Sequence, residues 1–205
     1  MVPIAPRLGV PTGRIVACDP FYCPDTLPFT VEVAAGAYPV VLCLAQFPRT
    51  GDERIAAAML RVQSTPAVRW EWAICQARDD EGDTARAAAA EEAECEPGST
   101  YCVDSGFGSF MDEAAIDALF DRAQDDEWDG EDAADYLQQR LDAQRLSGGA
   151  EWFNVPLDET SGVNMLIFTS GWGDGGHPSY WGFDAHGRPS CLLTDFGVLD
   201  DAELF

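Results

Sequence analysis

Alternating and continuous apolar segments divide most of this chain into short predicted strands. In residues 67–76 (AVRWEWAICQ), Val68, Trp70 and Trp72 alternate with charged or small residues, which is the period of two of a half-buried strand. Residues 163–169 (VNMLIFT) are apolar almost throughout, which is typical of a central strand buried on both faces. Further strands are expected at residues 14–18, 29–33, 38–45, 101–104, 151–155, 179–183 and 190–195.

Some neighbouring segments are predicted to pair. Residues 29–33 and 38–45 are expected to form a hairpin around the small residues AAGA. Residues 54–62 (RIAAAMLRV) fit either a helix or a buried strand, and we favour a strand antiparallel to 67–76. Residues 1–13 hold three prolines and predict an irregular arm.

Two helices are predicted in the middle of the chain. Residues 109–112 (SFMD) have the spacing of a capping box, and Ile116, Leu119 and Phe120 begin an apolar stripe. A second helix is expected at about 131–146. The predicted fold class is therefore α+β, an antiparallel β-sheet or sandwich with a central helix pair inserted between strands.

Length and composition favour a single domain. The 205 residues are 46% hydrophobic, enough for one core, so we expect one domain over residues 1–205. Residues 77–99 are charged, rich in alanine and poor in residues that pack, which predicts an acidic flexible insertion.

The net charge of −24 comes mostly from the middle of the chain. Residues 78–162 hold 24 acidic residues and five arginines, whereas residues 1–77 hold six of each. Such a charge disfavours binding to nucleic acid or to an anionic membrane, and it favours a basic protein partner. The alternative is an acidic face that only keeps the protein in solution.

Other features narrow the chemistry and the compartment. The chain has no lysine, which excludes a P-loop lysine and a Schiff-base lysine. The N-terminal residues do not resemble a signal peptide, and no apolar run reaches membrane-spanning length, so we expect a cytoplasmic protein. The seven cysteines form no CxxC motif and are interpreted mainly as small buried hydrophobes. No cofactor is predicted.

Residues 169–187 (TSGWGDGGHPSYWGFDAHG) are the strongest candidate for a functional surface, because they combine several glycines with large aromatic residues and both histidines. Trp172, Tyr180 and Trp181 are candidates for a recognition surface, together with Asp174 and His177. Because Tyr180 and Trp181 point to opposite faces of a strand, one of the two is expected to be in the core.

Candidate catalytic residues are Asp104, Asp174 and His177, because a histidine beside a carboxylate can act as a general base. His177 can equally be a loop residue without a catalytic role. A Cys191–His177 pair would require the fold to bring the two together.

Asp104, Asp112 and Asp174 lie in or near glycine-rich turns and are the candidate ligands of a divalent metal. No known metal-ligand spacing is present. The alternative is that each carboxylate accepts hydrogen bonds from its own turn.

Several motifs resemble one known family. The pieces are GRIVACDP at 13–20, VDSGFGSFMD at 103–112, SGWGDG at 170–175, PSYWGFD at 178–184 and CLLTDF at 191–196. Together they resemble the bacterial family called domain of unknown function 4241. The resemblance implies no particular activity, and no catalytic residue can be carried over from it.

Three functional hypotheses follow. The first is a cytoplasmic binding protein, of inhibitor or immunity type, that recognises a basic partner through the glycine- and tryptophan-rich loop. The second is a small-molecule or metal-dependent enzyme with an Asp/His pocket. The third is a structural domain in which this loop is only a rigid corner, and this hypothesis predicts that Trp172 is buried.

Overall fold

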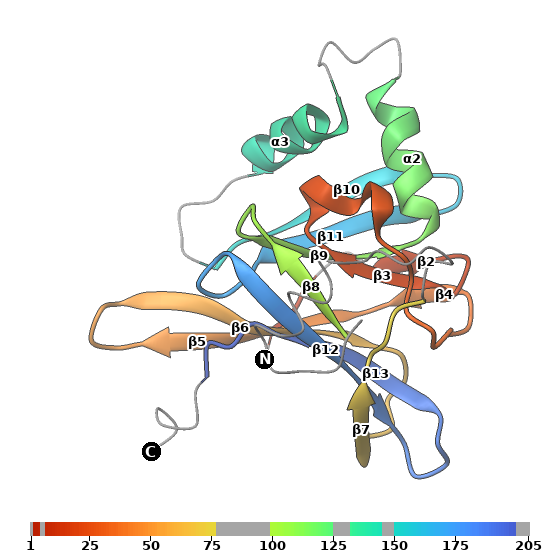
Figure 1. Cartoon of the computed structure of the whole chain (residues 1–205), viewed down its shortest axis with the longest axis vertical. Helices are drawn as coiled ribbons and strands as arrows, with labels where there is room; N and C mark the ends of the chain where they lie inside the picture. The colour runs from red at the N-terminus through yellow and green to blue at the C-terminus, as the bar shows by residue number, and fades with distance from the viewer. Residues whose placement is uncertain (1, 5–6, 77–98, 125–131, 145–149, 200–205) are drawn as a thin grey trace, which may run out of the picture.

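The computed structural model describes residues 2–4, 7–76, 99–124, 132–144 and 150–199. Its elements form three layers: a large antiparallel sheet, a smaller antiparallel sheet packed on it, and two helices on the far side of the smaller sheet (Figure 1). This arrangement confirms the predicted α+β class with a helix pair between strands.

The described elements are as follows in chain order. The strands before the helices are β1 (Val2–Pro3), β2 (Leu8–Val10), β3 (Ile15–Cys18), β4 (Gly36–Tyr38), β5 (Val40–Phe47), β6 (Asp52–Arg61), β7 (Arg69–Trp72), β8 (Thr100–Val103) and β9 (Phe107–Asp112). A 3₁₀ segment, η1 (Pro20–Asp25), follows β3. The helices are α2 (Ala114–Ala123) and α3 (Ala133–Gln144), and the remaining strands are β10 (Trp152–Asp158), β11 (Val163–Thr169), β12 (Gly175–Phe183) and β13 (Pro189–Asp195).

The large sheet has the order β1-β5-β6-β13-β12-β7, and the smaller sheet has the order β10-β11-β9-β3. Strand β12 has two partners on one edge: its first half pairs with β8 and its second half with β7. Strand β8 then leads directly into β9 of the smaller sheet. A short two-stranded sheet pairs β2 with β4.

The position of strand β11 between two cores explains why its sequence is apolar throughout. Leu166 and Phe168 face the core between the two sheets, whereas Met165 and Ile167 face the core beneath the helices. All four side chains are fully buried, because successive residues of a strand point to opposite faces and each face is covered.

The helices bury one side against the smaller sheet. Leu119 of α2 and Leu137 and Leu141 of α3 lie in the core that β10 and β11 share with the helices. The capping-box prediction is wrong, because residues 109–112 belong to β9. Helix α2 begins only at Ala114, whose backbone N–H donates to the Asp112 side chain at 3.0 Å.

Two pairing predictions, and the prediction of an irregular N-terminal arm, are also wrong. Residues 31–34 form no strand, and β5 pairs with β6 rather than with a segment at 29–33. Residues 54–62 are largely a strand, β6, but its partners are β5 and β13, and β7 pairs with β12 instead. The N-terminal arm contains two short strands, β1 and β2.

Three further expectations concern the acidic insertion, the cysteines and membrane-spanning helices. Residues 77–98 of the predicted acidic insertion lie outside the described residues, and Ser99, at its end, is buried. Six of the cysteines lie in the described part of the chain; all six are free thiols and four are buried. Among the described helices, none has the length and apolar character needed to cross a membrane.

Candidate functional site

The glycine- and tryptophan-rich loop makes a tight corner between β11 and β12. The Ser170 backbone N–H donates to the Gly106 carbonyl at 3.1 Å, which ties the corner to the turn between β8 and β9. Ser170 Oγ donates to the Gly173 carbonyl at 2.9 Å, and the Gly173 N–H donates back to the Ser170 carbonyl at 3.0 Å. These bonds close the corner within four residues.

The backbone at position 171 of this corner can be occupied only by glycine without strain. Its φ is +63°, and a Cβ there would lie 2.6 Å from Val198 Cγ2 and 2.9 Å from Phe196 Cβ. A side chain at this position would therefore be strained and would collide with the segment after β13. The close approach buries Gly171, while the next residue, Trp172, is exposed.

A cleft of about 360 Å³ lies beside this corner, lined by residues 172–178 and 195–197. We call it the Trp172 cleft. The Trp172 side chain is 59% exposed, Asp174 is exposed and Asp195 is half-buried. The cleft therefore has an indole and two carboxylates on its wall. The exposure of Trp172 contradicts the hypothesis that the loop is only a rigid structural corner.

Trp172 also contacts the β5–β6 hairpin. The Arg54 guanidinium lies 5.3 Å from the indole centroid, and the Phe47 ring lies 5.2 Å from it at a tilt of 48°. These contacts hold the indole in place without burying it. Neither Arg54 nor Phe47 was predicted from sequence as part of the site, because their proximity depends on how distant strands pack.

His177 lines the cleft, but its side chain is buried, with 6% exposure. Its ring packs edge-on against the rings of Phe196 and Tyr101, and the distances between ring centroids are 5.0 and 6.2 Å. Nε2 lies 3.3 Å from the Gly173 carbonyl oxygen, which can only accept, so Nε2 carries the hydrogen in this contact. Burial raises the pKa of Tyr101, so the phenol whose ring packs against His177 is neutral.

Asp104 and Asp174 are brought to the same end of one ladder. Strands β8 and β12 pair Val103 with Gly175, and the two aspartates are the next residues beyond this pair. The Asp104 backbone N–H donates to Asp19 Oδ2 at 3.0 Å, which fixes the turn that carries it. Within the described residues, no three His, Cys, Asp or Glu side chains are grouped so as to hold a metal.

Asp112 does not belong to this site. It lies at the far end of β9, is fully buried, and accepts hydrogen bonds from Thr12 Oγ1 at 2.8 Å and from the backbone N–H groups of Thr12 and Ala114 at 3.0 Å each. The bond from Ala114 matches the predicted alternative in which a carboxylate accepts from its own turn, whereas the two bonds from Thr12 join the end of β9 to a segment 100 residues away in sequence.

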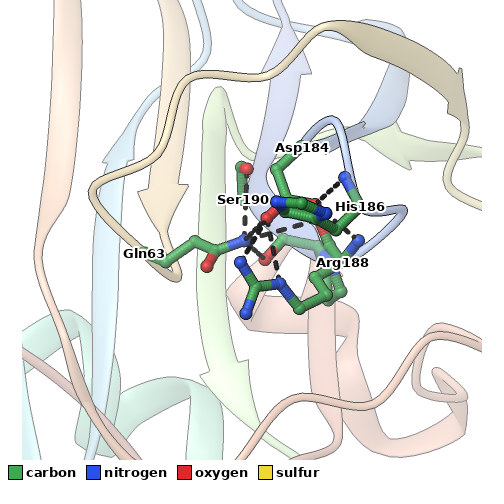
Figure 2. Close-up of polar contacts among 6 residues, drawn as sticks. Gln63, Asp184, His186, Arg188 and Ser190 are labelled. Atoms are coloured by element: carbon green, nitrogen blue, oxygen red, sulfur yellow. Dashed lines mark hydrogen bonds and ion pairs between the residues drawn. The ribbon is translucent and has the colours of Figure 1, made fainter.

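Asp184 has a similar role in the turn between β12 and β13 (Figure 2). Its Oδ1 accepts from the backbone N–H of Arg188 at 2.9 Å and of His186 at 2.8 Å. Its Oδ2 accepts from Arg188 Nε at 3.0 Å. Backbone hydrogen bonding by Arg188, followed by the other donors, lowers the pKa of Asp184 to about 2.

The two other predicted aromatic residues divide between surface and core, as the alternation of a strand requires. Trp181 is 1% exposed and packs edge-on against Phe29 at 6.3 Å, so it lies in the core and outside the recognition surface. Tyr180 is half-buried and stacks on Trp72, with the ring centroids 4.7 Å apart.

Cys191 and His177 are not brought together. Cys191 is opposite Gly182 in the β12–β13 ladder, about five residues along the strand from the position opposite His177. That separation is about 16 Å, so the structure contradicts a Cys–His pair. The wall of the Trp172 cleft instead includes Asp195 and Phe196, whose signal in the sequence is the motif CLLTDF at 191–196.

Comparison with known families matches residues 8–194 to the family described as "Protein of unknown function (DUF4241)", so the chain belongs to this family. The match covers every wall of the Trp172 cleft except residues 195–197. No curated protein and no solved structure matches the chain.

Proposed function

We propose that this member of the DUF4241 family is a cytoplasmic binding protein that recognises a basic partner protein at the Trp172 cleft. The observation that carries the proposal is the 59% exposed indole of Trp172, held beside Asp174 and Asp195 on the wall of one cleft. An inhibitor or immunity-type protein that neutralises a basic toxin is the specific form of this proposal.

The chemistry of the cleft suits an arginine or lysine side chain. Carboxylates pair with such cations, and an indole attracts them to its face. The intramolecular contact between Arg54 and Trp172 supports this choice, because a guanidinium already lies 5.3 Å from the ring. Exposed tryptophans beside a pocket are also the residues that most often dominate protein interfaces.

The charge of the whole chain supports the same choice of partner. A net charge of −24 attracts a basic protein over a distance and accelerates its association, while it repels acidic competitors. Long-range attraction is screened by salt, whereas the contacts in the cleft are short-range. Salt should therefore lower the association rate much more than it raises the dissociation rate.

A second candidate is a small-molecule or metal-dependent enzyme, which is favoured by one observation: Asp174 and His177 line the same cleft. The hydrogen bond from His177 Nε2 to the Gly173 carbonyl makes this nitrogen a poor general base, since its hydrogen is already donated. We therefore place this function second.

The proposal is tested with four purified chains: wild type, Trp172→Ala, Asp174→Asn and, as a matched control, Trp152→Ala. Trp152 is also exposed, at 39%, but it lies on β10 and outside the cleft. Each chain is used to capture proteins from a native lysate of the source cells. A basic protein that wild type and Trp152→Ala retain, but Trp172→Ala loses, is then purified and its binding kinetics are measured.

We expect Trp172→Ala to weaken binding of this partner by about a hundredfold and Asp174→Asn by about tenfold. We also expect the association rate to fall steeply as salt is added. The proposal fails if every captured protein binds Trp172→Ala and Trp152→Ala equally well, or if the partner is acidic.

A further inference from the structure

A second hollow, of about 440 Å³, lies at the opposite end of the β12–β13 pair from the Trp172 cleft. We call it the Arg61 pocket. The side chains that matter to the argument are Arg61, Gln63, Ser64, Thr65, Trp70 and Cys191. Its volume falls in the range of small-molecule sites, roughly 300–1,000 Å³.

One row of paired residues crosses four strands along the base of this pocket. Arg61 on β6 is opposite Cys191 on β13, and Cys191 is opposite Gly182 on β12. Gly182 is in turn opposite Trp70 on β7. Residues that are directly opposite in antiparallel strands project to the same face. The row therefore has a guanidinium at one end and an indole at the other.

This row faces away from the core. The adjacent row of the same sheet consists of Leu60, Leu192 and Trp181, and all three are buried between the two sheets. Because successive residues alternate between faces, the Arg61 row lies on the outer face. Trp70 is 49% exposed there, which leaves much of its ring accessible.

Gly182, the glycine of the YWG sequence, shapes the end of the pocket next to Trp70. A Cβ at this position would lie 2.7 Å from Ala67 Cβ, 2.8 Å from Cys191 Sγ and 3.1 Å from Trp70 Cζ3. The missing side chain lets the loop after β6 and the Trp70 ring lie directly on the sheet. This glycine is thus needed for close approach rather than for its backbone angle.

Arg61 is a cation without a partner in the described part of the chain, where its guanidinium makes no ion pair and no hydrogen bond. It lies near the Cys191 thiol: burial raises the pKa of Cys191, and the Arg61 charge partly opposes that rise. An arginine that faces a hollow in a chain so rich in carboxylates is a ready binding group for an anion.

The loop over the pocket is fixed at both ends. The backbone N–H groups of Val62 and Gln63 donate to the Ser190 carbonyl at 2.8 and 3.1 Å, and the Val68 N–H donates to the Phe183 carbonyl at 2.8 Å. The Gln63 amide also reaches the Pro189 carbonyl at 3.0 Å and Asp184 Oδ2 at 3.3 Å (Figure 2). A loop held in this way keeps the hollow open before a ligand arrives.

We propose that the Arg61 pocket binds a small aromatic anion, a molecule in which an aromatic ring is joined to a carboxylate or a phosphate. The ring stacks on Trp70, the anionic group pairs with Arg61, and the hydroxyls of Ser64 and Thr65 supply further hydrogen bonds. Arg61 and Trp70 are three strand spacings apart, so their backbones lie about 14 Å from each other. Their two long side chains extend into this space and leave a gap of the length of such a molecule. The site is independent of the Trp172 cleft.

The test is isothermal titration of the full chain with adenosine 5′-monophosphate, adenosine and benzoate. The variants are Arg61→Gln and Trp70→Ala, with Arg49→Gln and Trp152→Ala as controls, since Arg49 and Trp152 are exposed but do not line the pocket. Arg61→Gln removes only an exposed charge, so it tests the proposal even if Trp70→Ala lowers stability.

We expect the monophosphate or benzoate to bind at millimolar concentrations or below, and Arg61→Gln and Trp70→Ala each to weaken that binding about tenfold. Binding of the monophosphate alone assigns a phosphate ligand, and binding of benzoate alone assigns a carboxylate. The proposal is overturned if neither anion binds, if adenosine binds as well as its monophosphate, or if Arg61→Gln leaves the affinity unchanged.

Discussion

Asp19 and Ser105 share two hydrogen bonds across 86 residues of sequence: Oδ2 of Asp19 accepts from the Ser105 backbone N–H at 2.8 Å, and Oδ1 accepts from Ser105 Oγ at 2.8 Å. Asp19 also accepts from the backbone N–H groups of Asp104 and Phe21, each at 3.0 Å. One buried carboxylate thus joins the end of β3 to the turn that carries Asp104. The same turn supports the corner at Ser170, because its Gly106 carbonyl accepts from the Ser170 N–H.

Replacing Asp19 should therefore be costly. Asp19→Ala would leave backbone N–H groups of the β8–β9 turn without an acceptor, and we expect the free energy of unfolding to fall by about 3 kcal/mol. Urea denaturation of the purified variant measures the loss. Ser105→Ala, which removes a single hydroxyl donor, should cost about 1 kcal/mol. Equal and small losses in both variants would show that Asp19 does not hold the turn.

Gly171→Ala should also destabilise the protein, and a second glycine provides the control. At Gly171 the added methyl group meets both a positive φ and the side chains of Val198 and Phe196, so we expect a loss of about 3 kcal/mol. At Gly187 the φ is +74° but a Cβ would meet nothing within 4 Å, so Gly187→Ala should cost only about 1 kcal/mol. A thermal or urea series that finds the two losses equal would rule out the steric contribution.

Much of the architecture could be predicted because it rests on local alternation. The run at 163–169 indicates a strand with two buried faces, and β11 is such a strand, between the two cores. The same alternation predicts that Tyr180 and Trp181 separate, and Trp181 lies in the core. The exposed loop around Trp172 was predicted from its glycines and aromatic residues.

What the sequence did not reveal depends on tertiary pairing. Arg61, Cys191, Gly182 and Trp70 become neighbours only because β6, β13, β12 and β7 lie in that order, and the local pattern favours β6 beside β7 instead. Asp112 was misjudged for a different reason. Residues 109–112 have capping-box spacing, but Ser109 lies inside β9. Asp112, at the end of that strand, instead accepts from the N–H two residues on, as an N-cap residue does.

Asp184 should make the stability depend on pH in the acid range. Its pKa is lowered to about 2 in the folded protein by the hydrogen bonds of its turn, against about 3.9 for an unfolded aspartate. The folded state therefore gains stability from this group above about pH 4, and the gain is lost as the pH falls toward about 2.

The measurement compares urea midpoints of wild type and Asp184→Asn between about pH 2 and pH 6, where the carboxylate titrates. Wild type should be the more stable at the upper end, and the difference should shrink as the pH falls. Because all other carboxylates titrate in both chains, the difference isolates Asp184. A difference that stays constant with pH would show that the hydrogen bonds do not favour the ionised form.

Trp172 and Trp181 should lose very different amounts of stability on truncation, although only nine positions separate them. Trp181→Ala empties a site in the core between the two sheets, where the side chain is 1% exposed, and should lower the free energy of unfolding by about 3–5 kcal/mol. Trp172→Ala removes a ring that is 59% exposed, and should cost about 1 kcal/mol from its contacts with Arg54 and Phe47. Denaturation midpoints of the two variants provide the comparison, and a loss of several kcal/mol for Trp172→Ala would mean that the corner is retained for folding rather than for binding.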